Sequence, residues 1–467
     1  MCLSAYLRHF KIYFQINEDL TRGSAAVACR RFPGTHSYDR IAELLENINA
    51  NLGISYKKIV ATVTDNGANF VKCFKKFGFT CPHPDEDNNQ QDQDVQINDD
   101  DEEGDELTLL SFPEIPEEPL FNLPNHLRCA CHTLNLVATT DAAKGLKSPG
   151  LSKLKHTTMG KCSALWNAAG KPKSSEIINT VIGKQLRYPC VTRWNSMYDS
   201  VLQIQQLGMK INTLMQELKL PVFKENEFEF LEEYVVVMKP IAVALDKLQE
   251  DDKCYYGCLI PTLLVTKESL SAVKQNNLQL RCCMPLLEAV LSGYTARFQK
   301  YLDLDPQIMD AILASVSHPY FKLRWVSLTE GGKCDKTEEV KTQLKFSLQM
   351  AVRKITSSNV DMEERCSDSG DDDFFQSLEG SSTTPHNKED LEVLHYFQDT
   401  SKNLSCLLHY PNVLKVFKRY NTALPSSAPV ERLFSFSGMI HNPKRTRLSD
   451  AKFEQLVLLK ANGKHFI

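Results

Sequence analysis

The stretch that most constrains the fold is 58–72, which reads KIVATVTDNGANFVK. A continuous apolar and β-branched run from Ile59 to Val63 ends at the turn signal Thr64-Asp65-Asn66-Gly67. A short run of this kind, bounded by a turn, predicts a strand buried on both faces of a sheet. Asp65 would then follow the carboxyl end of the strand, where open α/β sheets bind their ligands.

Two interpretations of Asp65 follow from this position. A carboxylate there can hold a divalent metal ion for phosphoryl transfer. An Asp after a strand also commonly starts a turn or caps the next helix. The segment taken alone favours the second interpretation.

The chain has 467 residues, a length that predicts two or three domains. Its apolar fraction of 42% and charged fraction of 24% are typical of a soluble globular protein. The sequence contains no uninterrupted apolar run of about 18 residues, so we expect no membrane partner. The 15 cysteines lack a regular framework spacing, which favours reduced thiols in the cytosol or nucleus.

The net charge of −4 hides a separation of charge along the chain. The stretch from Asp85 to Glu106 contains twelve acidic residues and no Lys or Arg. Removing these twelve from the 58 acidic residues leaves 46 against 54 basic ones, a net charge of +8. A moderately basic body is compatible with contact to nucleic acid.

Around the central stretch, the order of predicted elements is typical of an α/β sheet with an antiparallel edge. We expect strands over 5–14 and 24–32 linked near Gly23, and a helix from Tyr38 that Gly53 ends. The strand over 58–64 leads to a helix over 69–77. A disordered acidic insertion follows over 83–118, and residues 127–137 predict a short strand that runs into a helix.

From residue 151 onward, helical periodicity replaces the strand signals. We therefore expect an all-α region over 151–394, interrupted by a linker at 357–384 that is rich in Ser, Asp and Gly. Near the end of the chain, Val430, Leu433 and Phe434 share a helix face. Ser449 is expected to cap a final helix, with Leu448 and Phe453 as its hydrophobic staple. That helix needs an apolar partner, either this chain's own sheet or a second copy.

Several polar groups are candidates for a site. Asp65 and Glu431 are a possible acidic pair if the fold brings them together. Cys129 and His132 form a C-x-x-H pair; with Cys81 and His83 they could make a four-ligand zinc site, but the spacing favours a hydrogen-bonded junction between strand and helix. The candidate contacts to DNA could equally be ordinary core and surface residues; they are Arg193, Trp194, Lys444, Arg445 and Arg447.

The order of the motifs resembles the hAT superfamily of DNA transposases and the host proteins derived from them, such as zinc-finger BED domain proteins. The motifs are GTHSYDRIAELL, VTDNGANF, RCACHTLNL, VTRWNS and SSAPVERLFSFSG followed by KRTRL. The resemblance covers nearly the whole chain apart from the acidic insertion and the linker at 357–384.

The resemblance implies an α/β fold: a truncated RNase H-like mixed sheet, interrupted by a large all-α insertion domain and completed by C-terminal helices. The implied parts are an RNase H-like start (1–82), the acidic insertion (83–118), an RNase H-like continuation (119–150), the all-α domain (151–394) and a C-terminal dimerisation region (395–467).

The resemblance also implies roles for single residues. In the family, three acidic residues bind divalent metal and cut and join DNA ends. Asp65 matches the second and Glu431 the third, while Cys129 and His132 match the family's C-x-x-H and Arg193-Trp194 its R-W, with Trp194 near a flipped base. The implied apolar contacts of a dimer are Leu414, Phe417, Val430, Leu433, Phe434, Phe453, Leu456 and Val457.

This sequence departs from the family's pattern in two ways. It starts after the position of the first acidic residue, and it does not contain the Cys and His ligands of a BED finger. Two of three carboxylates would hold metal poorly, so we expect no cofactor and no catalysis.

We therefore expect an inactive, transposase-derived nuclear protein that forms a homodimer or higher homo-oligomer, with DNA as a candidate partner. One alternative is an active hAT-type transposase that cuts DNA with Mg²⁺ or Mn²⁺. Another is an interaction scaffold that does not bind DNA.

Overall fold

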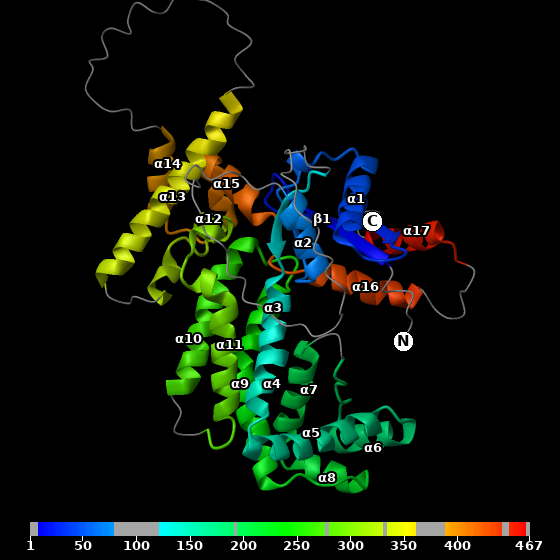
Figure 1. The fold of residues 1–467 in the computed structure, drawn as a ribbon. Coiled ribbons are helices and arrows are strands. Elements are labelled where there is room, and N and C mark those ends of the chain that lie inside the picture. The colour runs from blue at the N-terminus through cyan, green and yellow to red at the C-terminus, as the bar shows by residue number, and fades with distance from the viewer. Residues whose placement is uncertain are drawn as a thin grey trace, which may run out of the picture. The chain divides into compact units, whose positions relative to one another are not determined.

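The computed structural model describes residues 8–78, 121–190, 194–275, 280–329, 334–360, 388–440 and 448–463. In this part of the chain the protein is mostly helical, with two small two-stranded sheets (Figure 1). The expected mixture of strands and helices is therefore present, but the described strands lie in two separate pairs instead of one mixed sheet. None of the described helices combines the length and apolar character needed to cross a bilayer.

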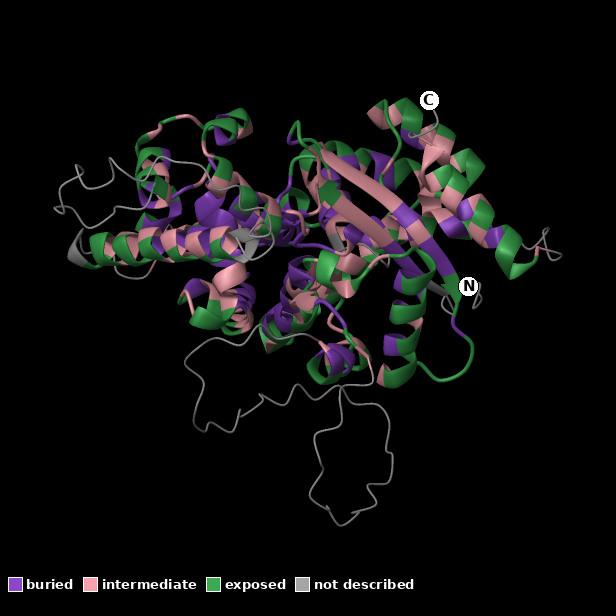
Figure 2. Cartoon of the chain, turned by 90° about the horizontal axis from the view of Figure 1, so that it is seen from above, coloured by how far each residue is buried: buried purple, intermediate pink, exposed green. Residues whose placement is uncertain are grey.

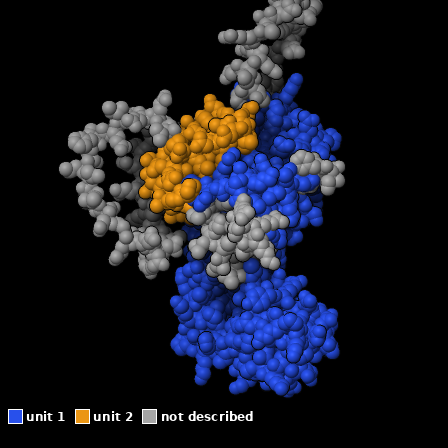
Figure 3. Space-filling model, turned by 90° about the vertical axis from the view of Figure 1, so that its right-hand side faces the viewer, with its two compact units in different colours: residues 1–32, 63–66, 127–467 blue, residues 33–62, 67–126 orange. Residues whose placement is uncertain are grey.

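The chain forms two compact units, which Figure 3 shows in different colours. The smaller unit comprises residues 33–62 and 67–126. In it, α1 (Tyr38–Asn51) packs on α2 (Ala68–Phe77), and the rings of Tyr38 and Phe77 stack with their centroids 6.3 Å apart. As predicted, α1 begins at Tyr38 and ends before Gly53, which has a φ of +64°.

The strand predicted from residue 58 begins later than expected. Residues Tyr56–Lys58 form a 3₁₀ turn, and the strand β3 covers only Ala61–Thr64. It pairs with β4 (Asn125–Arg128). All four residues of β3 are partly exposed, so the expectation of a strand buried on both faces was wrong. In the described part of the chain this sheet has two strands, and Val63 of β3 packs only partly buried against the main core.

The larger unit contains an antiparallel hairpin of β1 (Arg8–Ile16) and β2 (Arg22–Arg31). Gly23 lies inside β2, opposite Gln15, and not in the link between the strands as predicted. The link is instead 17–21, where the Asp19 carboxylate accepts hydrogen bonds from the amide (3.0 Å) and hydroxyl (2.6 Å) of Thr21. A side-chain turn of this kind needs no glycine.

Two C-terminal helices cover the hairpin. They are α16 (Ala428–Ile440), which packs on β1, and α17 (Asp450–Ala461), which packs on β2. Ser449 caps α17 as predicted, accepting a hydrogen bond from the Lys452 amide at 3.3 Å. The buried residues shared by these four elements, called the hairpin core below, are Phe10, Ala26, Cys29, Leu433, Ile440, Phe453 and Val457.

Between residues 149 and 398 the described elements are helices, without a strand among them. The α-helices that follow β4 are α3 (Ala130–Leu136), α4 (Ala142–Leu146), α5 (Pro149–Ala169), α6 (Pro172–Ile182), α7 (Trp194–Leu207), α8 (Lys210–Glu217), α9 (Glu225–Leu248), α10 (Leu259–Gln275), α11 (Met284–Leu302), α12 (Met309–Ser317), α13 (Cys334–Val360), α14 (Lys388–Gln398) and α15 (Pro411–Asn421). A π-helix, Val137–Asp141, joins α3 to α4, and 3₁₀ turns occupy Tyr256–Cys258, Pro306–Ile308, Arg324–Leu328 and Leu404–His409. Because α13 is helical to Val360, the first residues of the predicted linker at 357–384 are helix; the rest, from 361, lie outside the described residues.

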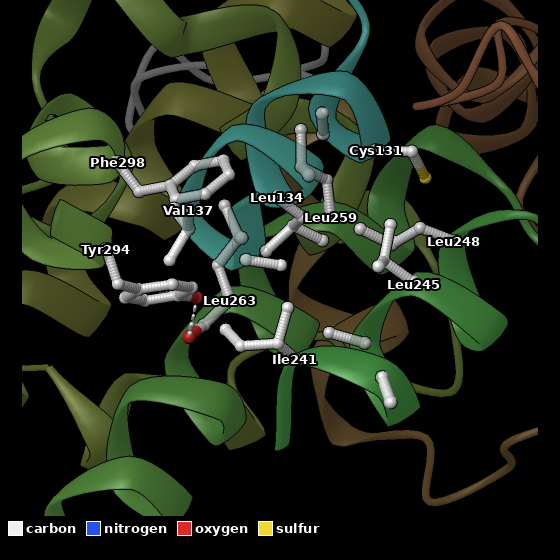
Figure 4. Packing of buried hydrophobic residues seen from close by; sticks show 14 of the residues in the cluster. Cys131, Leu134, Val137, Ile241, Leu245, Leu248, Leu259, Leu263, Tyr294 and Phe298 are labelled. Atoms are coloured by element: carbon white, nitrogen blue, oxygen red, sulfur yellow. Dashed lines mark hydrogen bonds between the residues drawn. The ribbon is translucent and has the colours of Figure 1, made fainter. Parts of the chain in front are cut away.

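The main core of the larger unit forms where α3, α4, α9, α10 and α11 lie side by side. Figure 4 shows part of it, including Leu134 from α3, Leu245 from α9 and Phe298 from α11. The Tyr294 hydroxyl donates to the Leu263 carbonyl at 2.6 Å, which satisfies the one polar group of that ring. Buried residues gather on facing sides of the helices, and exposed ones line the outer sides (Figure 2).

Candidate functional site

Asp65 follows the last residue of β3 and is exposed. The segment before it is fixed by the Thr64 carbonyl, which accepts a hydrogen bond from the Cys129 amide at 2.9 Å. The segment after it is fixed by the Asn66 side chain, which donates to the Thr133 hydroxyl at 3.0 Å. Both partners lie at the start of α3, so this helix holds the position of Asp65.

Cys129 is the residue at which distant segments of the chain meet. It caps α3, and its sulfur accepts hydrogen bonds from the amides of His132 (3.3 Å) and Ser427 (3.2 Å). The next amide, that of Ala130, donates to the Pro425 carbonyl at 2.9 Å. Residues 425–427 are thereby joined to the strand–helix junction that also fixes Asp65.

Glu431 lies in the first turn of α16, one turn after Ser427, and its amide donates to the Ser427 carbonyl at 3.2 Å. Its side chain is exposed. The charge of Glu431 contributes to the raised pKa of the Cys131 thiol, behind the larger effects of the hydrogen bond to Cys129 and of burial. The segments of Asp65 and Glu431 are thus both anchored at the start of α3.

The pKa values of the two thiols of this junction are shifted in opposite directions. Hydrogen bonds from Cys131, Ser427 and His132 lower the pKa of Cys129 to about 6, against the opposing effect of burial. The Cys129 side chain is 1% exposed, so its sulfur is closed to reactants in solution. In the described structure Cys129 is a buried acceptor that joins the start of α3 to the segment before α16, and the part that His132 plays in this contact is that of its backbone amide.

Among the residues that the structure describes, Asp65 and Glu431 do not belong to a three-carboxylate group. Within the described ranges, the one group of three or more His, Cys, Asp or Glu ligand atoms within 4.8 Å of one another is Glu233, Cys282 and Cys283. Neither Asp65 nor Glu431 belongs to it. Two-metal phosphoryl transfer uses ions about 3.5–4 Å apart that several ligands share, and two exposed carboxylates fall short of such a set.

The Glu233 group has a structural explanation. Its carboxylate accepts hydrogen bonds from the amides of Arg281 (2.7 Å), Cys282 (2.9 Å) and Cys283 (2.7 Å), just before α11. These bonds satisfy amides at the helix start. Burial, together with the Glu233 charge, raises the pKa of the Cys282 thiol to about 12, so the thiol stays protonated. This group was missed in the sequence, where Glu233 and the Cys pair are separated by 49 residues.

The remaining candidate residues fall largely outside the described part of the chain. Arg193, Lys444, Arg445 and Arg447 are outside it, as are Cys81 and His83. Trp194 is the first residue of α7. The Asn195 side chain next to it donates to the Asp246 carboxylate at 2.5 Å and so ties the start of α7 to α9.

The eight apolar residues assigned to a dimer divide into two groups. Four are buried within the single chain: Phe417 in the main core, and Leu433, Phe453 and Val457 in the hairpin core. The other four are partly buried, and they are Leu414, Val430, Phe434 and Leu456. The buried four offer no surface to a second copy in this conformation.

A search of curated proteins found no match to this chain. The family model of the hAT family C-terminal dimerisation region matches residues 376–462, which include α14, α15, α16 and α17. Through these residues the chain is similar to the hAT family, and the similarity supports a transposase-related protein that self-associates.

Proposed function

We propose that this protein is a transposase-derived, catalytically inactive nuclear protein that self-associates through its C-terminal region and contacts DNA. The observation that carries the proposal is the match of residues 376–462 to the hAT C-terminal dimerisation region. The matched residues include Glu431 and also Ser427, whose amide is hydrogen-bonded to the Cys129 sulfur.

An RNase H-like origin of the fold is part of this proposal. It is supported by the junction at Cys129, whose amide is hydrogen-bonded to the end of β3 and whose sulfur is hydrogen-bonded to Ser427, 298 residues later and just before α16. In an RNase H-like enzyme, acidic residues from separate elements would have to meet at such a junction. Asp65 and Glu431 are the residues that this chain places beside it.

Inactivity is supported by the donor set around these two carboxylates. In the part of the chain that the structure describes, neither carboxylate belongs to a group of three or more possible metal ligands. Two carboxylates without a third would hold the Mg²⁺ or Mn²⁺ of an active transposase poorly.

A nicking assay tests inactivity. Supercoiled plasmid is incubated with the full chain and Mn²⁺, beside the variants Asp65→Asn and Glu431→Gln and the control Glu18→Gln. Glu18 is an exposed acidic residue in the link of the hairpin. We expect all four proteins to leave the plasmid equally intact. If the wild type and the control nick the plasmid and both site variants do not, the protein is an active transposase instead.

Contact with DNA is tested separately. The apparent affinity for duplex DNA is measured between about 50 and 200 mM salt, where proteins that contact phosphates lose affinity steeply. The proposal requires measurable binding that weakens as salt rises. Absence of binding at low salt would leave only the interaction scaffold.

A further inference from the structure

Two adjacent helices of the larger unit expose large apolar side chains. On α13, Phe346 is 58% exposed and Met350 is 46% exposed. On α14, Leu391 is 44% exposed and Leu394 is 43% exposed. Residues three or four apart share a face of a helix, so each helix presents one apolar pair to solvent. These four residues are called the α13–α14 strip.

The two pairs lie next to each other. The Arg353 guanidinium on α13 forms an ion pair with the Asp390 carboxylate on α14, with Nε 3.1 Å from Oδ1. The two helices run antiparallel (Figure 1). Met350 lies one turn before Arg353 and Leu394 one turn after Asp390, so both extend from the ion pair in the same direction along the helix pair.

The residues of the α13–α14 strip are different from the apolar residues that pack these two helices onto the main core. Leu348 and Val352 of α13 and Val393 and Tyr396 of α14 are fully buried against the main core. Single exposed apolar residues are common on protein surfaces, whereas a contiguous exposed group marks an interaction site.

The position of α14 is fixed by polar contacts at its middle and at its C-terminal end. The buried Lys322 ammonium donates to the Tyr396 carbonyl at 2.6 Å and also to the Asp399 carbonyl. The Glu392 carboxylate accepts hydrogen bonds from the amides of Asn412 (2.7 Å) and Val413 (2.9 Å) at the start of α15. A surface fixed in this way needs little ordering when it binds a partner.

We propose that a second copy of this chain binds on the α13–α14 strip, strip against strip about a two-fold axis. The inference rests on the self-association proposed above and adds the surface that carries it. Leu391 and Leu394 lie within the region matched by the dimerisation family model, and Phe346 and Met350 extend their surface onto α13. A two-fold contact buries the same patch of both copies, which suits an uncharged apolar strip.

Other exposed residues of the matched region are less suited to this role. Met439 on α16 is 69% exposed and Leu459 on α17 is 58% exposed. Each is the only large apolar side chain on its described helix that is exposed to this degree. They therefore make a matched control from the same region.

The test measures the dimer dissociation constant of the full chain by sedimentation velocity. The double variant Met350→Glu/Leu394→Glu places charges in the contact and is expected to raise the constant about 100-fold, the effect of removing two central apolar contacts. The controls Leu459→Glu and Val265→Glu, the latter at a 52% exposed position on α10, are expected to leave it within about threefold of wild type. Thermal melting verifies that each variant is folded.

A second measurement does not depend on a charged substitution. The photo-crosslinking residue p-benzoylphenylalanine is placed at position 394 or, as the control, at position 265. The inference predicts a covalent dimer from position 394 alone. The wild type could dimerise while the double variant still dimerises and no crosslink forms from position 394. That result would overturn the α13–α14 strip as the contact and leave self-association standing. A wild type that stays monomeric at every concentration would overturn both.

Discussion

The Cys129 side chain is 1% exposed and accepts hydrogen bonds from two backbone amides, those of His132 and Ser427. The first contact is local and could be predicted, because a residue before a helix commonly accepts a bond from the third helical amide. The second spans 298 residues. No local pattern marks Ser427 as its partner, so the sequence identified the motif and not the junction that it makes.

His318 provides a test at the scale of one residue. Its ring is buried among Tyr255, Phe321 and Phe417, and burial lowers its pKa from 6.5 to about 4. Because the folded pKa lies below the unfolded one, the fold favours the neutral ring. The stability that the fold gains from holding His318 neutral is complete above pH 6.5. It is lost as the pH falls through the folded pKa.

We expect the free energy of unfolding in urea to fall by roughly 2 kcal/mol between pH 7 and pH 5 through His318 alone. The variant His318→Phe keeps an aromatic ring and cannot titrate, so its loss over the same range is expected to be smaller by that amount. Equal losses in wild type and variant would show that His318 is not the buried neutral group described here.

At the scale of elements, the sequence predicted ends of helices better than ends of strands. Gly53 and Ser449 act through their own backbone and side chain, and both were predicted correctly. The predicted start of β3 was wrong. Val60 is β-branched, as strand residues often are, but it is 38% exposed and lies outside the strand. A strand depends on its partner, and β4 begins more than 60 residues later.

Two glycines give opposite predictions for the same substitution. A Cβ on Gly257 would lie 2.4 Å from the Ala314 carbonyl oxygen and 2.8 Å from Oδ1 of Asn421. The buried Asn421 accepts a hydrogen bond from the Gly257 amide at 2.9 Å, so neither group can withdraw freely. A Cβ on Gly438, inside α16, would meet nothing within 4 Å.

We therefore expect Gly257→Ala to destabilise the protein by about 1–3 kcal/mol, through overpacking of this contact. Gly438→Ala is expected to stabilise it by about 0.5–1 kcal/mol, because Ala is the better helix former. Thermal melting of the two variants beside wild type gives both values. A neutral Gly257→Ala would mean that the contact between the turn at 256–258 and α12 is looser than described.

At the scale of the whole molecule, the C-terminal helices belong to this chain's own folded cores. The sequence left open whether the final helix packs on its own sheet or on a second copy, and α17 packs on β2. Its buried residues therefore stabilise the single chain. A dimer has to use surface that remains exposed, which periodicity alone could not identify because exposed and buried apolar residues alternate on the same helices.

Self-association of the full chain is the claim on which the functional account depends. Its most direct test is the molar mass by light scattering across a wide range of protein concentration. We expect a mass that rises with concentration from 52.9 kDa to at least twice that value. A mass that stays at 52.9 kDa up to the highest concentration would contradict it.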